Sequence, residues 1–159
     1  MSPGENPVFH LKFEVPSDPR LLSVVRSAVT QLAAVAGLPE QDCRGVTRAL
    51  DEALSNIIRH AYQNQSGQPI EVSCRRLPAD PSGRPGNRLE FLLEDWGRSV
   101  DASTLQGRSL DEVRPGGLGL HIIRSIMDEV EYQPFGDHNR LRLVKYLRDS
   151  GPAGDGEGE

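Results

Sequence analysis

Apolar and polar residues alternate with two different periods along the chain, and the changes of period divide it into elements. Residues 8–15 alternate every second position, as in a half-buried strand, and residues 70–75 and 89–93 repeat that pattern. Between the first two strands, apolar residues return every three or four positions over 19–36 and 39–62. This spacing predicts two amphipathic helices, separated at Gly37.

The second half of the chain contains longer irregular stretches. A run rich in Pro and Gly over 78–87 predicts a hairpin connection, and residues 98–115 are expected to form a cover with brief helical turns. A further helix is marked by Leu120, Ile123, Ile126, Met127 and Val130, and closing strands are expected near 130–133 and 140–146. This order of elements predicts an α/β two-layer sandwich, with a mixed, mostly antiparallel sheet covered by helices on one face.

The length of the chain bounds its domain organisation. With 159 residues, one domain is expected, over residues 8–148. Residues 149–159 are Gly-rich and acidic and contain no large apolar residue, so a disordered tail is predicted there.

Composition excludes several classes of function. The net charge is −5 and the 18 basic residues are scattered, which argues against binding to nucleic acid or to a membrane surface. The longest apolar run is 32–38 and no secretory leader pattern is visible, so a cytoplasmic protein is expected. Cys43 and Cys74 are expected to be buried hydrophobes, and neither lysine lies in a P-loop context.

Three polar residues follow one another every four positions along the second predicted helix. Glu52, Asn56 and His60 would therefore share one edge of that helix, beside the apolar stripe. A carboxylate and a carboxamide at the border of a core can line a pocket. A solvated helix face is the alternative interpretation of the same pattern.

Two further motifs carry candidate chemistry. Asp95-Trp-Gly97 follows directly on a strand, where a carboxylate can accept a hydrogen bond from the amine of adenine, and where Gly97 would leave room for a flat base. Arg114-Pro-Gly-Gly-Leu-Gly-Leu120 leads into a helix, so its backbone N–H groups can face phosphate oxygens. Taken singly, the first motif is also typical of a turn and the second of a hinge.

The order of these motifs resembles the N, G1 and G2 boxes of the GHKL ATPases, which share the Bergerat fold. Within that superfamily, residues 52–62 and 117–130 are most similar to the anti-sigma-factor serine-protein kinases of the RsbW and SpoIIAB type. The chain departs from the family pattern at Ser99, where a second glycine is common, and at Asn139 and Arg140, where small threonines are common.

The resemblance implies roles for individual residues. Asn56 would hold Mg²⁺, Glu52 would act as general base, Asp95 would bind adenine, and His60 would be structural. Phosphates would be held by the residues of the glycine motif: Gly116, Gly117, Gly119 and Leu120, with Gly97 shaping the pocket and Arg114 either neutralising the γ-phosphate or remaining solvated.

The resemblance also implies an activity: an ATP- and Mg²⁺-dependent protein serine/threonine kinase that acts as an anti-sigma factor. Its expected partners are a sigma factor, a STAS-domain anti-anti-sigma protein that it phosphorylates, and a second copy of itself in a homodimer. The alternative is a non-catalytic, ATP-dependent binding switch. Intact Glu52 favours the enzyme.

Overall fold

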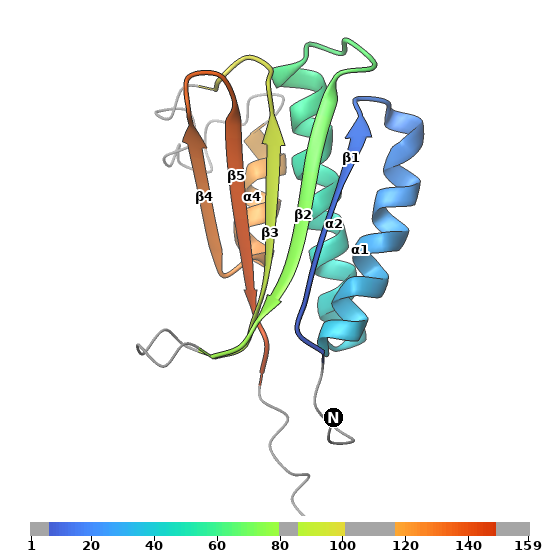
Figure 1. The fold of residues 1–159 in the computed structure, drawn as a ribbon, viewed down its shortest axis with the longest axis vertical. Helices are drawn as coiled ribbons and strands as arrows, with labels where there is room; N and C mark the ends of the chain where they lie inside the picture. The colour runs from blue at the N-terminus through green and yellow to red at the C-terminus, as the bar shows by residue number, and fades with distance from the viewer. Residues whose placement is uncertain (1–6, 80–85, 101–116, 149–159) are drawn as a thin grey trace, which may run out of the picture.

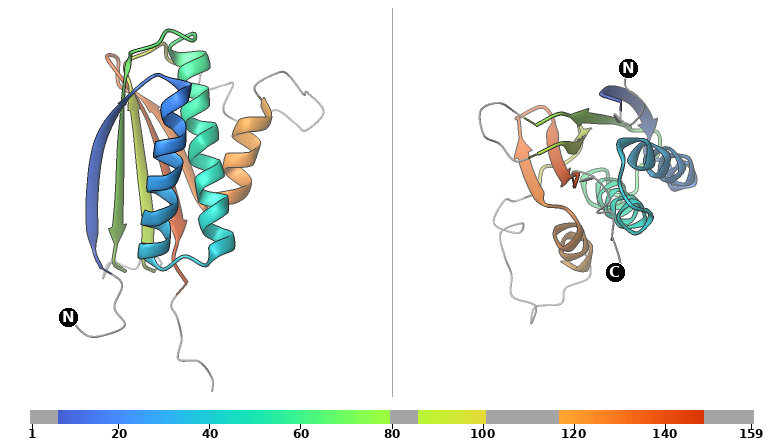
Figure 2. Two further views of the ribbon diagram at one scale, coloured as in Figure 1. Left: turned by 90° about the vertical axis from the view of Figure 1, so that its right-hand side faces the viewer. Right: turned by 90° about the horizontal axis from the view of Figure 1, so that it is seen from below.

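The described part of the protein forms two layers, an open five-stranded sheet and the helices α1, α2 and α4 on one of its faces (Figures 1 and 2). The computed structural model describes residues 7–79, 86–100 and 117–148. The strands occur in the order β1-β2-β3-β5-β4. The elements are β1 (Phe9–Pro16), η1 (Pro19–Leu21), α1 (Leu22–Ala36), α2 (Glu40–Asn56), η2 (Ile57–Ala61), β2 (Pro69–Leu77), β3 (Arg88–Asp95), α4 (Gly117–Ile126), β4 (Glu129–Pro134) and β5 (Asn139–Tyr146).

The predicted fold class is confirmed, and the sheet is more regular than expected. All four strand pairings between the described strands are antiparallel, so the expected mixed sheet has no parallel pair among them. For the first pair, β1 with β2, the connecting helices α1 and α2 have similar lengths of 15 and 17 residues. Two such helices return the chain to the end where β1 finished, and β2 therefore runs back antiparallel to β1 (Figure 1).

Local signals set the ends of the first two helices. The Asp18 carboxylate accepts a hydrogen bond from the backbone N–H of Arg20 at 2.9 Å, and this cap begins the turn η1 that leads into α1. Gly37 adopts a φ of 99°, the left-handed conformation that ends α1 at low cost only for glycine. Both ends agree with the predicted boundaries.

The core lies between the sheet and the helices. Its largest fully buried side chains come from both layers and include Phe91, Leu93 and Ile70 from the sheet and Leu50 and Leu54 from α2. Cys43 and Cys74 are also buried, as predicted, and burial raises the pKa of the Cys74 thiol to about 12.

The C-terminal helix ends earlier than predicted. From its spacing in the sequence, Val130 is expected on this helix and also at the start of a strand. In the structure α4 ends at Ile126, and Val130 lies in β4, opposite Leu143. Its apolar side chain fits both the helical and the strand period, so spacing alone cannot decide between them.

Gly45 on α2 faces the end of α4. A Cβ built on Gly45 would lie 3.3 Å from Ile126, so the glycine lets the two helices approach.

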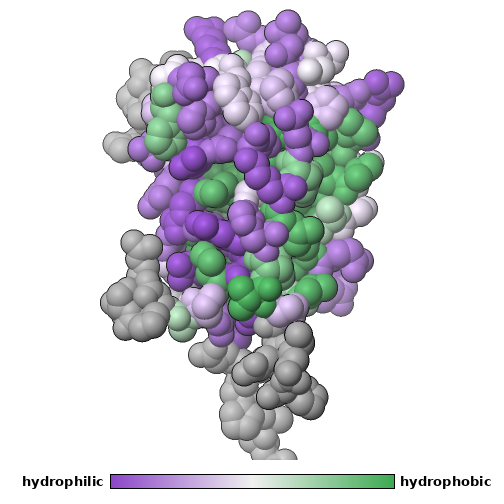
Figure 3. Space-filling view, in the orientation of Figure 1, coloured by the Kyte–Doolittle hydropathy of each residue, from purple (hydrophilic) through white to green (hydrophobic). Residues whose placement is uncertain are grey.

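The two faces and the outer edge of the sheet differ in character. One face is covered by α1, α2 and α4, and the other faces the viewer in Figure 3. Apolar side chains gather there on the side of β1 and α1, where Val8, Leu11 and Val24 are 66%, 44% and 63% exposed (Figure 3). Among the described strands, β1 pairs only with β2, so its outer edge is open.

Candidate functional site

Glu52 and Asn56 meet the beginning of α4 at one end of the molecule. They lie one turn apart on α2, and a Cβ built on Gly119 would lie 2.9 Å from Glu52 Oε2 and 3.3 Å from Asn56 Nδ2. Only a residue without a side chain fits this contact comfortably. Glu52 makes no hydrogen bond or ion pair within the described part of the chain, so its carboxylate is available to a ligand.

His60, the third member of the predicted row, is exposed, whereas Glu52 and Asn56 are half-buried. The helix changes to a π-turn over Ile57–Ala61, in which the N–H of Tyr62 donates to the Ile57 carbonyl at 2.9 Å. A π-turn inserts an extra residue into the helical repeat and rotates the residues beyond it about the helix axis. Ala61 lies in the core, next to the exposed His60.

The amide of Asn56 has a neighbour on its own helix. Arg59 Nη2 donates to Asn56 Oδ1 over 3.2 Å. Arg59 is exposed, and a solvated guanidinium contact of this kind contributes little to stability. The Asn56 oxygen can accordingly be released to another positive group at small cost.

Asp95 ends β3 and is almost completely buried, with 4% of its surface exposed. Its Oδ1 accepts hydrogen bonds from the Gly97 N–H and from Asn139 Nδ2, both at 2.9 Å. Burial raises the pKa of the Asp95 carboxyl, and these two hydrogen bonds oppose the rise. Neither bond uses Oδ2, which remains an acceptor for a ligand.

Gly97 passes against the end of the π-turn. A Cβ built there would lie 2.5 Å from the Ala61 carbonyl oxygen, and the next N–H, of Arg98, donates to that oxygen at 2.9 Å. The glycine therefore allows the chain after β3 to pack on the helix end. Sequence reasoning expected the missing side chain to admit a base, a role that stays a prediction.

Sequence reasoning missed the residues that hold the segment after Asp95. Tyr62 Oη accepts from the Trp96 N–H at 2.8 Å, and Tyr132 Oη accepts from the Val100 N–H at 3.0 Å. Ser99 Oγ donates to Asn139 Oδ1 at 2.7 Å, so two departures from the family pattern contact each other. Their unusual identities were a signal in the sequence, but their contact depends on strands far apart in the chain.

The glycine motif is only partly described. Gly117, Gly119 and Leu120 form the first turns of α4, whereas Arg114 and Gly116 lie outside the described residues. Most of the predicted cover over 98–115 and the predicted tail over 149–159 also lie outside them. The last turns of α2, the end of β3 and the beginning of α4, which carry the described site residues, lie at the same end of the molecule (Figure 1).

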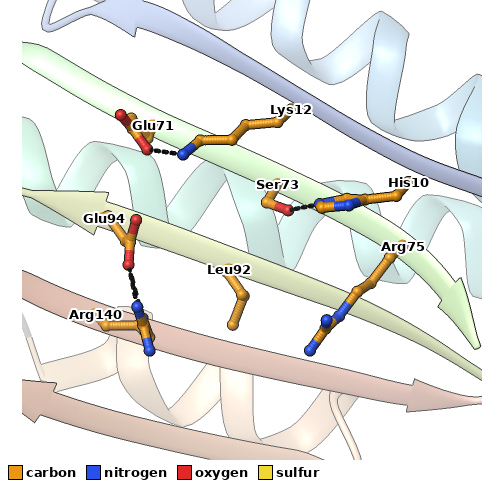
Figure 4. A pocket seen from close by; sticks show the side chains of 8 residues that line it. All are labelled: His10, Lys12, Glu71, Ser73, Arg75, Leu92, Glu94 and Arg140. Carbon is orange, nitrogen blue, oxygen red and sulfur yellow. Dashed lines mark hydrogen bonds and ion pairs between the residues drawn. The ribbon is translucent and has the colours of Figure 1, made fainter.

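A hollow of about 200 Å³ on the uncovered face of the sheet offers a second place to look for a site (Figure 4). Its charged groups are already neutralised, because Lys12 pairs with Glu71 and Arg140 Nη2 lies 2.6 Å from Glu94. Arg75 pairs with the buried Glu90, whose other oxygen accepts from Arg142. His10 is hydrogen-bonded to Ser73. The residues that line this hollow therefore offer little surplus charge to attract a phosphate group.

Comparison with known proteins decides the family. A family model described as a histidine kinase-like ATPase domain matches residues 15–145. The chain belongs to this family. ATP use follows from the family, and the candidate site lies entirely within the matched range.

Several relatives carry the same name. The chain is 28% identical to the serine-protein kinase RsbW of Bacillus pumilus, over 77% of each chain. It is 28% identical to that of Bacillus subtilis, over 90% of this chain and 89% of the relative. It is 29% identical to that of Bacillus velezensis, over 88% and 87%. The predicted superfamily and enzyme class, a protein serine/threonine kinase, are confirmed by these relatives.

A solved structure supports the same fold. The RsbU and RsbW domains of Rv1364c from Mycobacterium tuberculosis align with a TM-score of 0.60 at 17% identity, over 89% of this chain and 33% of that chain.

None of the helices in the described ranges has the length and apolarity that crossing a membrane requires. The described ranges also contain no cluster of three His, Cys, Asp or Glu residues arranged to hold a metal.

Proposed function

We propose that this histidine kinase-like ATPase is an ATP- and Mg²⁺-dependent protein serine kinase that sequesters a sigma factor and phosphorylates a STAS-domain anti-anti-sigma partner. The observation that carries the proposal is the meeting of Glu52 and Asn56 at Gly119, the beginning of α4. An available carboxylate, a metal-competent amide and a helix N-terminus are the groups that phosphoryl transfer requires. The RsbW names of the relatives support the choice of partners.

Glu52 would act as the general base. It would accept the proton of the attacking serine hydroxyl, and the absence of a competing cation on its carboxylate in the described part of the chain favours that task. Its neighbour Asp51 is engaged differently, since Asp51 Oδ1 accepts from Arg26 Nη1 at 2.7 Å. The two acidic residues are therefore not interchangeable.

Asn56 would hold Mg²⁺ through Oδ1 once Arg59 has moved away. The bound ion would neutralise charge on phosphate oxygens. A single amide oxygen is a sufficient protein contribution, because Mg²⁺ usually keeps several waters and takes its other ligands from the phosphates.

The homodimer is proposed to form along β1. Its open edge adjoins an apolar groove of about 300 Å³ between β1 and α1, lined by Phe13, Val15, Leu21, Val24 and Ala28 among others. In the proposed dimer, β1 pairs antiparallel with β1 of a second copy, and the two Phe13 residues lie opposite each other. Lys12 of each copy then lies opposite Glu14 of the other copy, so opposite charges face each other at two places. Sedimentation equilibrium tests this: a monomer at all concentrations contradicts it.

The decisive experiment for the kinase is phosphate transfer. The full chain is incubated with labelled ATP, Mg²⁺ and candidate STAS domains from the same genome, and phosphoserine is measured by mass spectrometry. Transfer to a partner supports the kinase. Nucleotide-dependent binding of a STAS partner without any transfer favours the non-catalytic switch instead.

Replacing Asp95 by asparagine tests base recognition. The side-chain oxygen of the introduced asparagine can keep the two hydrogen bonds that Oδ1 accepts, so only the ligand-facing atom changes from acceptor to donor. An unpaired polar group costs about 1–3 kcal/mol, so ATP affinity should fall about tenfold or more. Calorimetry with ATP measures this, and an unchanged affinity in the folded variant removes Asp95 from base recognition.

Replacing Asn56 by alanine tests metal binding. The three atoms nearest a Cβ built on Gly119 all belong to Glu52 and Asn56, and Asn56 Oδ1 is the amide oxygen among them. Mg²⁺-dependent nucleotide binding should therefore be lost, while metal-free binding persists. Titration of ATP with and without Mg²⁺ measures the difference, and Arg59→Ala is the control because it frees Oδ1. Tight Mg²⁺-ATP binding by Asn56→Ala contradicts the assignment.

A further inference from the structure

Asn139 is the most buried polar neighbour of Asp95, with 2% of its surface exposed. It is the first residue of β5 and lies opposite Asp95 in the sheet. Its Nδ2 donates to Asp95 Oδ1 at 2.9 Å and to the Gly97 carbonyl at 3.2 Å. The Asn139 side chain thus holds both the Asp95 carboxylate and the Gly97 carbonyl of the Asp-x-Gly motif.

The orientation of this amide follows from its partners. A carboxylate oxygen and a backbone carbonyl can only accept hydrogen bonds, so the NH₂ group of Asn139 must face Asp95 and Gly97. Its oxygen then points to Ser99, whose hydroxyl donates to it at 2.7 Å. Ser99 therefore supplies the donor that this amide orientation requires, and the amide in turn holds the Asp95 carboxylate.

We infer that Asn139, whose oxygen accepts from Ser99, is a positioning residue that makes the site select 6-aminopurine over 6-oxopurine nucleotides. The inference rests on the proposed function, in which Asp95 binds the base. With Oδ1 occupied by two donors, Asp95 presents Oδ2 as an acceptor only. Such an atom pairs with an amino group and repels a keto oxygen.

Loss of the Asn139 donor would change the chemistry of Asp95. Burial already raises the pKa of this carboxyl, and the Asn139 hydrogen bond is the largest of the influences that lower it. Without that bond the pKa rises further, so Asp95 becomes protonated at a higher pH. A protonated carboxyl can donate a hydrogen bond, so Asp95 could then pair with the keto oxygen of a 6-oxopurine.

Other ionisable groups also act on Asp95. They are His138 in the turn between β4 and β5, Tyr62 after η2, and Tyr132 on β4. Burial raises the pKa of both tyrosines, so they stay neutral near neutral pH. The imidazole of His138 acts on Asp95 through its charge. The pH dependence is therefore measured in a His138→Gln background.

The test compares ATP with inosine triphosphate, which carries a keto oxygen in place of the amine. Calorimetry gives both dissociation constants for wild type, Asn139→Ala and Ser99→Ala, from about pH 6 to about pH 8. The ATP preference is the dissociation constant for inosine triphosphate divided by that for ATP. In Asn139→Ala, ATP affinity should fall about tenfold, and this ratio should fall by at least as much. That preference should weaken further as pH falls, with a midpoint at higher pH than in wild type.

Ser99→Ala and a distant control make the outcome interpretable. Ser99 is exposed, so its removal leaves the fold intact, and a smaller loss of ATP preference, about threefold, is expected. Ser73→Ala loses one buried hydrogen bond, to His10 on the uncovered face, and should leave the preference unchanged. The inference is overturned if Asn139→Ala or Ser99→Ala keeps the wild-type preference. If wild type itself binds both nucleotides equally, base recognition by Asp95 fails instead.

Discussion

Replacement of Glu52 by alanine is expected to lower the rate of phosphate transfer to the STAS partner by about 10² to 10⁴-fold. A general base acts mainly in the transition state, so the dissociation constants for ATP and for the sigma factor should stay near their wild-type values. The carboxylate beside Gly119, which has no partner among the described residues, motivates this expectation. Single-turnover transfer measures the rate, and calorimetry measures the binding.

Asp51→Ala is the matched control for this variant. Asp51 is the adjacent residue on α2, but its carboxylate is paired with Arg26 of α1 and lies away from Gly119. Its loss should change the transfer rate by less than about twofold, because a partly exposed ion pair contributes little. A Glu52→Ala protein that transfers phosphate at the wild-type rate would exclude the general-base role. Parallel loss of ATP binding would indicate a structural role.

Replacement of Gly97 by alanine is expected to destabilise the protein by about 3 kcal/mol. The new Cβ would lie 2.5 Å from the Ala61 carbonyl oxygen and 2.7 Å from its carbon. These are backbone atoms of the π-turn and cannot move aside singly, so the chain after β3 must shift and the Arg98 hydrogen bond to Ala61 is strained. A thermal midpoint lowered by about 10 °C is expected in calorimetric unfolding.

Gly119→Ala provides the contrast. Its Cβ would approach Glu52 Oε2 at 2.9 Å, and this is the free end of a flexible side chain. The fold should therefore tolerate the change, with a thermal midpoint within about 3 °C of wild type. Nucleotide binding should instead be lost, because the methyl group fills the site between Glu52 and Asn56. Equal thermal midpoints for Gly97→Ala and wild type would contradict the packing role of Gly97.

Much of the fold could be predicted because its signals are local. The period of two in β1, β2 and β3 and the period of three to four in α1 and α2 depend only on which neighbouring side chains are apolar. The cap at Asp18 and the left-handed Gly37 act within a few residues of themselves. Glu52 and Asn56 could be paired in advance because they lie one turn apart on one helix.

Features that depend on contacts between distant segments were decided only by the tertiary structure. The π-turn at the end of α2 packs Ala61 into the core and against Gly97, just after β3. Asn139 becomes a partner of Asp95 because β5 pairs beside β3, 44 residues away in sequence. Spacing along the chain carries no information about such neighbours, since only the folded sheet brings them within hydrogen-bonding distance.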